Sequence, residues 1–135
     1  MLIAAAAALL YLFGGPGNDG LFGDLMTKYA GDAITSTIAD EARRKLALDG
    51  LSLLTNDTKD FNDLISEEIE LVGALIKNYN SRPEDFENNY LTMLTSQQKL
   101  LDKIWEDRRN MLVHITPGEW EKIFESAKAA AQENN

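Results

Sequence analysis

The stretch that decides the fold is Ser81-RPEDFENNYLTMLTSQQKLLDKIWEDRRNMLVH-Ile115, which predicts one long α-helix. Ser81 can cap its start, Pro83 suits a first turn, and Glu84 stands three residues after Ser81, as a capping box requires. Steps of four and three residues separate the apolar positions, and this is the spacing of a heptad seam. The seam comprises Phe86, Tyr90, Met93, Gln97, Leu100, Ile104 and Met111. Such a seam is more typical of a bundle core than of a cofactor site.

Working outward, the same periodicity predicts a helix on each side of a short connector. The first covers residues 21–48, with Gly50 placed like the residue that follows a helix end. The connector is 51–58, and the second helix covers 60–79 with Asn56 or Asp57 as its N-cap. Its expected buried face comprises Phe61, Leu64, Ile65, Val72, Leu75, Ile76 and Tyr79.

A fourth helix is predicted after Thr116-Pro117-Gly118-Glu119, a second capping box with proline at the first helical position. Its expected inward side chains are Trp120, Ile123, Phe124 and Ala127. Four helices with short connections predict an all-α protein with an antiparallel four-helix bundle at 24–135.

The N-terminal residues 1–13 read MLIAAAAALLYLF and carry no charged side chain. Thirteen helical residues reach only about 20 Å, against roughly 30 Å of hydrocarbon in a bilayer. Three interpretations remain: a short or truncated membrane anchor, a secretory signal without its basic n-region, or a helix packed on the domain. The anchor is the leading one. Its expected membrane-contacting residues are Leu2, Ile3, Leu9, Leu10, Tyr11, Leu12 and Phe13.

The segment 14–23 is predicted to be a flexible joint, because it holds five of the nine glycines together with Pro16. Lysine and arginine near a membrane span mark its cytoplasmic side. No such residue precedes Lys28, whereas Asp19 and Asp24 follow the apolar segment. The bundle is therefore expected to face away from the cytoplasm, in the periplasm or another extracytoplasmic space, anchored at the inner membrane.

The composition excludes several kinds of function. The formal net charge of −9 disfavours nucleic acid as a partner, because that binding depends on lysine and arginine. The chain has no cysteine, so disulfides and thiolate chemistry are excluded. His114 is the only histidine, which is too few for a di-iron bundle or a histidine zinc site. It is expected to be a surface or capping residue.

No pattern in the chain points to catalysis. Glu67, Glu68 and Glu70 are interpreted as solvated surface, because close neighbours on one helix do not face each other across a cleft. Neither a Gly-x-Ser-x-Gly elbow nor a phosphate-binding glycine loop occurs. We therefore expect no enzyme activity, no catalytic residues, no metal site and no cofactor.

One short motif resembles a known class. Residues 94–98, Leu-Thr-Ser-Gln-Gln, match the L-T-x-x-Q pattern of small helical periplasmic chaperones of the envelope-stress class, and 115–119 form an imperfect second copy. The resemblance covers two five-residue segments of the 135 residues and does not assign the chain to that class. It implies a helical homodimer that binds unfolded proteins.

Together these features predict a non-enzymatic, membrane-anchored interaction or accessory subunit of an envelope complex. The alternative is an exported soluble protein of the periplasm, chaperone-like or ligand-binding. The expected partners are other proteins, either in a membrane complex or as a homodimer through the heptad seam. Leu21, Phe22 and Leu25 are the candidate partner-binding residues, since they lie close to the anchor.

Overall fold

The computed structural model describes residues 24–133, and every regular element in that range is an α-helix. The helices are α2 (Asp24–Thr37), α3 (Glu41–Lys77), α4 (Pro83–Leu112) and α5 (Pro117–Glu133). The predicted all-α class is confirmed for this part of the chain. The apolar segment 1–13 and the joint 14–23 lie outside the described residues.

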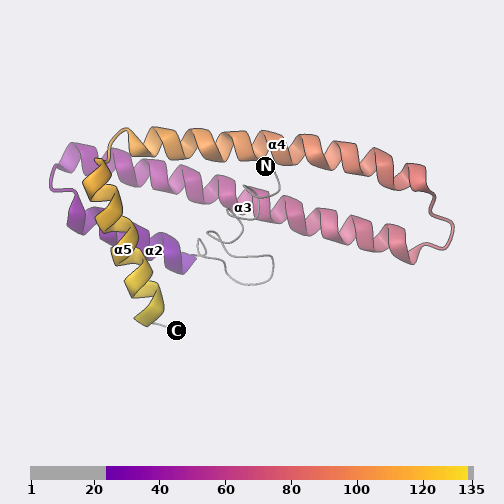
Figure 1. Ribbon diagram of the computed structural model, residues 1–135, viewed down its shortest axis with the longest axis horizontal. Helices are drawn as coiled ribbons and strands as arrows, with labels where there is room; N and C mark the ends of the chain where they lie inside the picture. The colour runs from indigo at the N-terminus through magenta and orange to yellow at the C-terminus, as the bar shows by residue number, and fades with distance from the viewer. Residues whose placement is uncertain (1–23, 134–135) are drawn as a thin grey trace.

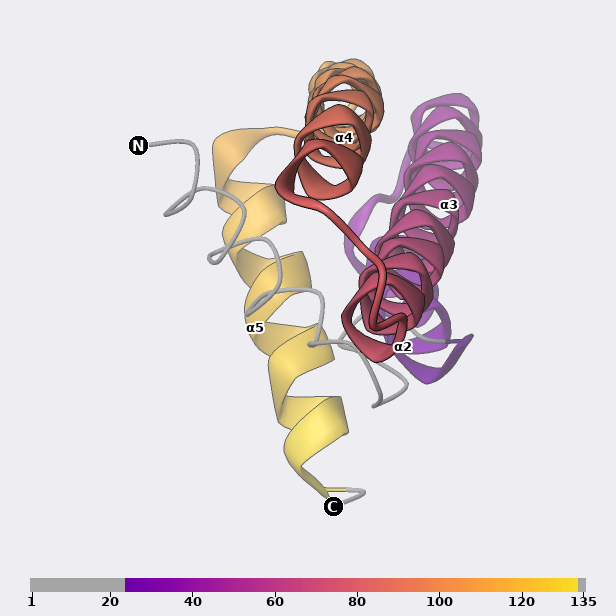
Figure 2. The same cartoon turned by 90° about the vertical axis from the view of Figure 1, so that its right-hand side faces the viewer.

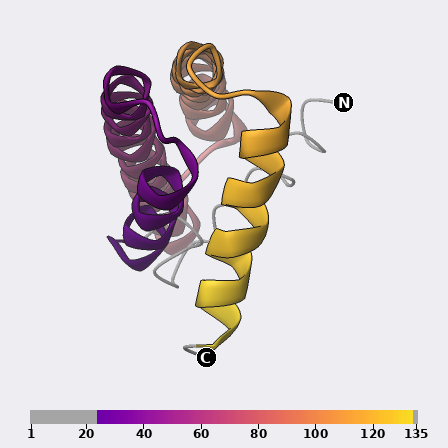
Figure 3. The same ribbon diagram turned by 90° about the vertical axis from the view of Figure 1, so that its left-hand side faces the viewer.

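A long antiparallel hairpin of α3 and α4 forms the axis of the molecule (Figure 1). The 37 residues of α3 extend over about 55 Å at about 1.5 Å per residue. In contrast, α2 has 14 residues and α5 has 17, and both pack at one end of the hairpin (Figure 3). All four helices therefore meet at that end alone. We call residues 64–98, where only α3 and α4 run side by side, the hairpin tip.

The hydrophobic core lies at the end where the four helices meet. Ile34, Ile38 and Met111 are its most completely buried large side chains. Phe61 is the last buried apolar residue of α3, and Leu101 is the first of α4. Between these two positions, across the whole tip, no apolar side chain is fully buried. The heptad seam of α4 is thus buried only in its C-terminal half.

The predicted helix boundaries before residue 60 are wrong in two places. The helix expected over 21–48 is broken at residues 38–40, where the Asp40 carboxylate caps α3 by accepting from the backbone N–H of Arg43 at 2.8 Å. The expected connector 51–58 is helical and belongs to α3. Leu51, Leu54 and Thr58 are all buried there, at a helical spacing of three and four residues.

Gly50 lies inside α3 and not after a helix end, so its predicted role is wrong. A methyl group added there would stand 2.9 Å from Cβ and 3.1 Å from Cα of Met111. Glycine is favoured here because α3 comes so close to Met111 of α4 that an added side chain would force a shift.

The start of α5 follows the predicted capping box. The Thr116 backbone N–H donates to Glu119 Oε2 at 2.9 Å, and the Glu119 N–H donates to Thr116 Oγ1 at 3.2 Å. Arg43 of α3 also donates to both Glu119 oxygens, at 2.7 and 2.8 Å. These hydrogen bonds from Arg43 and from Thr116 lower the pKa of Glu119 to about 2. The cap therefore also joins α5 to α3.

The start of α4 uses different residues from those expected. The backbone N–H of Arg82 donates to Asp85 Oδ2 at 2.9 Å, so the reciprocal pair is one residue later than Ser81 and Glu84. Ser81 Oγ has no hydrogen-bond partner. In α5 the predicted inward position of Phe124 is wrong, because 43% of this residue is exposed, whereas Ile123 and Ala127 are buried.

Candidate functional site

The residues proposed from the sequence as site residues fall where the structure gives no side-chain description. Residues 1–13, Leu21 and Phe22 precede the described range. Leu25 lies in the first turn of α2, but its side chain is not among those described. Within residues 24–133, no helix combines the length and the apolar character needed to cross a membrane. The membrane and partner assignments at these positions stay predictions.

The hairpin tip exposes an unusual number of large apolar side chains. Ile76 is 71% exposed and Tyr79 is 99% exposed, although both were expected on the buried face of their helix. Phe86 and Tyr90 of the predicted seam are exposed as well. The complete set in the tip is Ile69, Leu71, Ile76, Tyr79, Phe86, Tyr90, Leu91 and Leu94. Figure 2 looks along the hairpin from this end.

This exposure has a simple cause. A helix with an apolar arc wider than one neighbour can cover needs a second neighbour to bury the rest. At the other end of the hairpin α2 and α5 provide it, but their 14 and 17 residues do not extend along α3 and α4 to the tip. The periodicity of the sequence correctly predicts the apolar faces. In the tip, none of the other described helices packs on them.

A polar pair joins the two helices inside the tip. Gln97 Nε2 donates to Glu68 Oε2 at 2.6 Å, and Glu68 is only 7% exposed. The expectation that Glu68 is solvated surface is therefore wrong, whereas Glu67 and Glu70 are exposed as predicted. Glu68 Oε1 is buried without a partner. This hydrogen bond is a buried polar contact between α3 and α4 within the tip.

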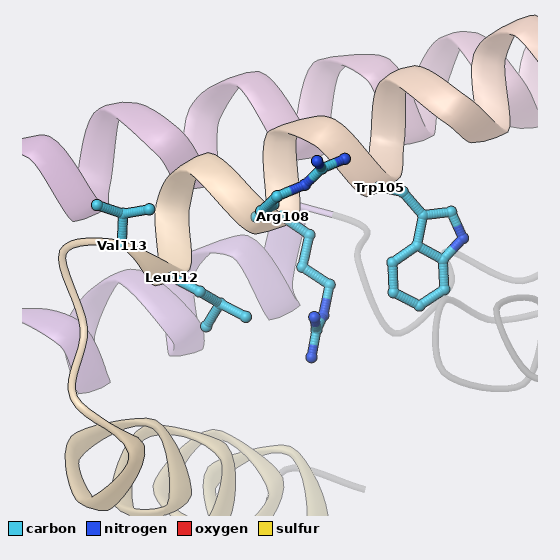
Figure 4. Close-up of a pocket in the computed structure, with 5 residues that line it drawn as sticks. Trp105, Arg108, Leu112 and Val113 are labelled. Atoms are coloured by element: carbon cyan, nitrogen blue, oxygen red, sulfur yellow. The ribbon is translucent and has the colours of Figure 1, made fainter.

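The C-terminal turns of α4 line a shallow hollow of about 420 Å³ with Trp105, Arg108, Arg109, Leu112 and Val113 (Figure 4). The Arg108 guanidinium lies 5.4 Å from the Trp105 ring centroid and 5.8 Å from that of Trp120 on α5. Such cation–π contacts help to hold α5 against α4. Because Trp105 is 45% and Val113 75% exposed, the hollow does not enclose a small molecule as ligand pockets do.

A cluster of charged groups connects α3 and α4 beside the core. Lys103 Nζ donates to Asp57 Oδ1 at 2.8 Å, and Asp57 is 4% exposed. Burial acts to raise the pKa of Asp57, but hydrogen bonds from Asp107 and Lys103 hold it below its usual value. For Asp107, burial and the hydrogen bond to Asp57 raise the pKa to about 6. Asp57, expected as a helix cap, is instead the ionised partner of this pair.

The raised pKa of Asp107 predicts that its ionisation destabilises the fold near neutral pH. The folded chain favours the neutral carboxyl of Asp107. The contribution of this group to the stability of the fold is therefore complete below about pH 4, its pKa in the unfolded chain, and is lost as pH rises through about 6. Asp107→Asn, which keeps this position uncharged at every pH, should raise the free energy of unfolding by about 1 kcal/mol at about pH 7.5. Urea denaturation of both proteins measures this difference. The difference should shrink as pH falls and approach zero only below about pH 4, and a difference that is constant with pH contradicts the prediction.

Metal-binding clusters are not found among the described residues. No group of three or more histidine, aspartate or glutamate side chains there could hold a metal ion. His114 lies in the turn between α4 and α5, and its backbone carbonyl accepts from Arg43 Nη1 at 3.3 Å. The backbone of this residue thus takes part in the contact that joins α5 to α3.

The fold and the surface together define an all-α hairpin protein with an apolar tip. Comparison of the chain with protein-family models, with curated proteins and with solved structures finds no match. The function is therefore argued from the surface of the described residues.

Proposed function

We propose that the protein is a non-enzymatic interaction subunit that residues 1–13 hold at a membrane and that binds another protein through the hairpin tip. The observation that carries the protein-binding part is the group of eight large apolar side chains exposed within residues 64–98. Soluble proteins seldom leave such groups uncovered, and where they do the surface is usually an interaction site. The membrane part is supported by the uncharged apolar sequence of residues 1–13.

The tip replaces Leu21, Phe22 and Leu25 as the leading partner-binding region. The described side chains of the tip carry the argument, whereas those three residues are supported only by their position in the sequence. A role as an accessory subunit in the bacterial envelope suits this arrangement, because an anchored domain with a projecting apolar hairpin can hold a second protein near the membrane.

Cell fractionation tests the anchor. The full chain should stay with membranes after a high-salt wash, and a chain lacking residues 1–13 should move to the soluble fraction. Recovery of intact full chain in the soluble fraction would rule out anchoring by this segment.

Crosslinking in cells tests the tip. The double variant Ile69→Ser with Leu94→Ser should lose the crosslinked partner, because each substitution removes apolar contact area from an exposed side chain. Leu53→Ser is the matched control, since Leu53 is also an exposed leucine of α3 but lies outside the tip. Equal crosslinking by the double variant and the control contradicts the proposal.

The alternative function is an exported chaperone-like protein, and one observation favours it. Leu94, in the segment that resembles the chaperone motif, is 42% exposed on the tip. A chaperone of this kind should suppress aggregation of several unrelated unfolded proteins. A dedicated subunit should bind one folded partner and give no general suppression.

A further inference from the structure

Part of the exposed apolar set of the tip, including Ile69 and Ile76 of α3, lies on the side of the hairpin that α2 covers farther along α3. A methyl group added at Gly31 of α2 would lie 3.9 Å from Leu48 Cδ2, and Thr27 Oγ1 lies 3.3 Å from Thr55 Oγ1, so Leu48 and Thr55 face α2. Residues seven apart share one side of a helix in a paired hairpin. Ile69 and Ile76 follow Thr55 by two and three such steps and continue the same row.

The corresponding row on α4 leads to α5. Arg108 lies against Trp120 of α5, and Leu94 precedes Arg108 by two steps of seven. Leu91 precedes Trp105, which also contacts Arg108, by the same interval. Figure 1 shows α2 and α5 on one side of the hairpin, and Figure 3 agrees. Tyr90 stands four residues before Leu94 and so lies one turn away on the same side of α4. We call Ile69, Ile76, Leu91 and Leu94, together with Tyr90, the tip face.

The tip face therefore continues an interface that helices already occupy at the other end of the hairpin. There α2 packs against both α3 and α5, and Leu48 of the α3 row and Trp120 of α5 lie against the buried core. The same helix pair, with the same spacing of apolar positions, presents the tip face with nothing over it among the described helices. An occupant with a helical apolar stripe fits a surface of this periodicity.

The charges around the tip face determine whether a basic or an acidic partner is favoured there. Within residues 64–98 the exposed carboxylates are Glu67, Glu70, Glu84, Asp85 and Glu87, and the cations are Lys77 and Arg82. Glu84 and Glu87 lie on the same side of α4 as Leu91 and Leu94, because the four are spaced by three, four and three residues. A second copy of this acidic tip would meet like charges, whereas a basic partner would meet opposite ones.

We propose that the tip face binds an amphipathic helix of another protein, with an apolar stripe flanked by lysine and arginine. This inference rests on the proposed function, since it names the chemistry of the partner for the same surface. The partner helix packs against the exposed side of the α3–α4 pair, as α2 packs against α3 at the other end.

Two synthetic helices of about 18 residues serve as probes, both with the same leucine stripe, one flanked by lysine and one by glutamate. Binding to the purified full chain is measured by fluorescence anisotropy at physiological salt. The lysine-flanked helix should bind about tenfold more tightly than the glutamate-flanked helix. Ile69→Ser with Leu94→Ser should weaken its binding about tenfold, and Leu53→Ser should leave it unchanged.

Charge reversal separates a local effect from the effect of the net charge. Glu84→Lys with Glu87→Lys should abolish the preference for the lysine-flanked helix. Glu121→Lys with Glu125→Lys changes the net charge by the same amount on two exposed positions of α5 and should leave that preference in place. If both pairs of substitutions reduce the preference equally, the attraction is to the whole acidic protein and the inference is overturned.

The variant Tyr90→p-benzoylphenylalanine carries a photo-crosslinker on the tip face and identifies which molecule occupies that face. An adduct at twice the chain mass, or a crosslink within one chain to residues 1–13, overturns the inference. An adduct with another protein that the lysine-flanked helix displaces supports it. If the tip variants lose the partner in cells but the lysine-flanked helix does not compete, the chemistry assigned here is wrong while the proposed function stands. If the tip variants keep the partner, the proposed function itself fails.

Discussion

Trp120→Ala is expected to lower the free energy of unfolding by about 3 kcal/mol, the lower end of the range for truncating a core tryptophan. Trp120 is half-buried, packs against the core and lies over the guanidinium of Arg108. The substitution removes these contacts from α5, and helices in proteins owe most of their stability to such tertiary packing. Thermal unfolding should show a decrease in Tm of about 10–15 °C for a domain of this size.

Phe124→Ala is the control for this prediction. Phe124 is an aromatic residue of the same helix, but 43% of it is exposed, so its truncation should cost less than about 1 kcal/mol. An unchanged Tm for Trp120→Ala, or equal losses for the two variants, would mean that α5 is not docked on α2 and α4 through Trp120. The surface of α5 would then need a different explanation.

Local signals in the sequence predicted the helices well where short-range hydrogen bonds decide the structure. The box of Thr116 and Glu119 was predicted from four residues, and the structure confirms it, because its donors and acceptors lie within one turn. Arg43 was not expected to join this cap. Its contact with Glu119 spans 76 residues of sequence, and no local pattern can reveal such a pair.

The burial of the apolar faces could be predicted only in part. The spacing of Phe61, Ile76, Tyr90 and Ile104 correctly predicts helices with one apolar side. Whether that side is covered depends on the lengths and positions of α2 and α5, which are properties of the whole fold. Phe61 and Ile104 are buried, whereas Ile76 and Tyr90 are exposed, although all four belong to predicted buried faces.

The charged cluster between α3 and α4 likewise could not be predicted from the sequence. The position of Asp57 before the predicted second helix indicates a helix cap, and no local pattern links it to Asp107. The hairpin brings the two carboxyl groups together across 50 residues of sequence, and burial then separates their pKa values. This pairing depends on the register of α3 against α4, and that register cannot be inferred from a single sequence.

The helical environment of Gly50 leads to a further stability prediction. Glycine inside a helix costs about 1 kcal/mol relative to alanine, and this local cost explains why Gly50 was expected after a helix end. In the structure an added Cβ would stand 2.9 Å from Met111 Cβ, so Gly50→Ala must push α3 and α4 apart. Overpacking of this kind costs about 1–3 kcal/mol. After the gain in helix propensity, the net loss should be about 1–2 kcal/mol by urea denaturation.

Gly73→Ala, in the same helix, is expected to change the free energy of unfolding in the opposite direction. Gly73 is exposed in α3 and an added Cβ would meet nothing within 4 Å, so only the helix propensity changes. The variant should therefore be more stable than the native chain by about 0.5–1 kcal/mol. The two substitutions are chemically identical, and the close approach of Met111 is the physical difference that should reverse the sign. If Gly50→Ala stabilises the chain as Gly73→Ala does, α3 and α4 do not touch at Gly50 in solution, and the register of the hairpin, on which the position of the tip face depends, is different from the one described.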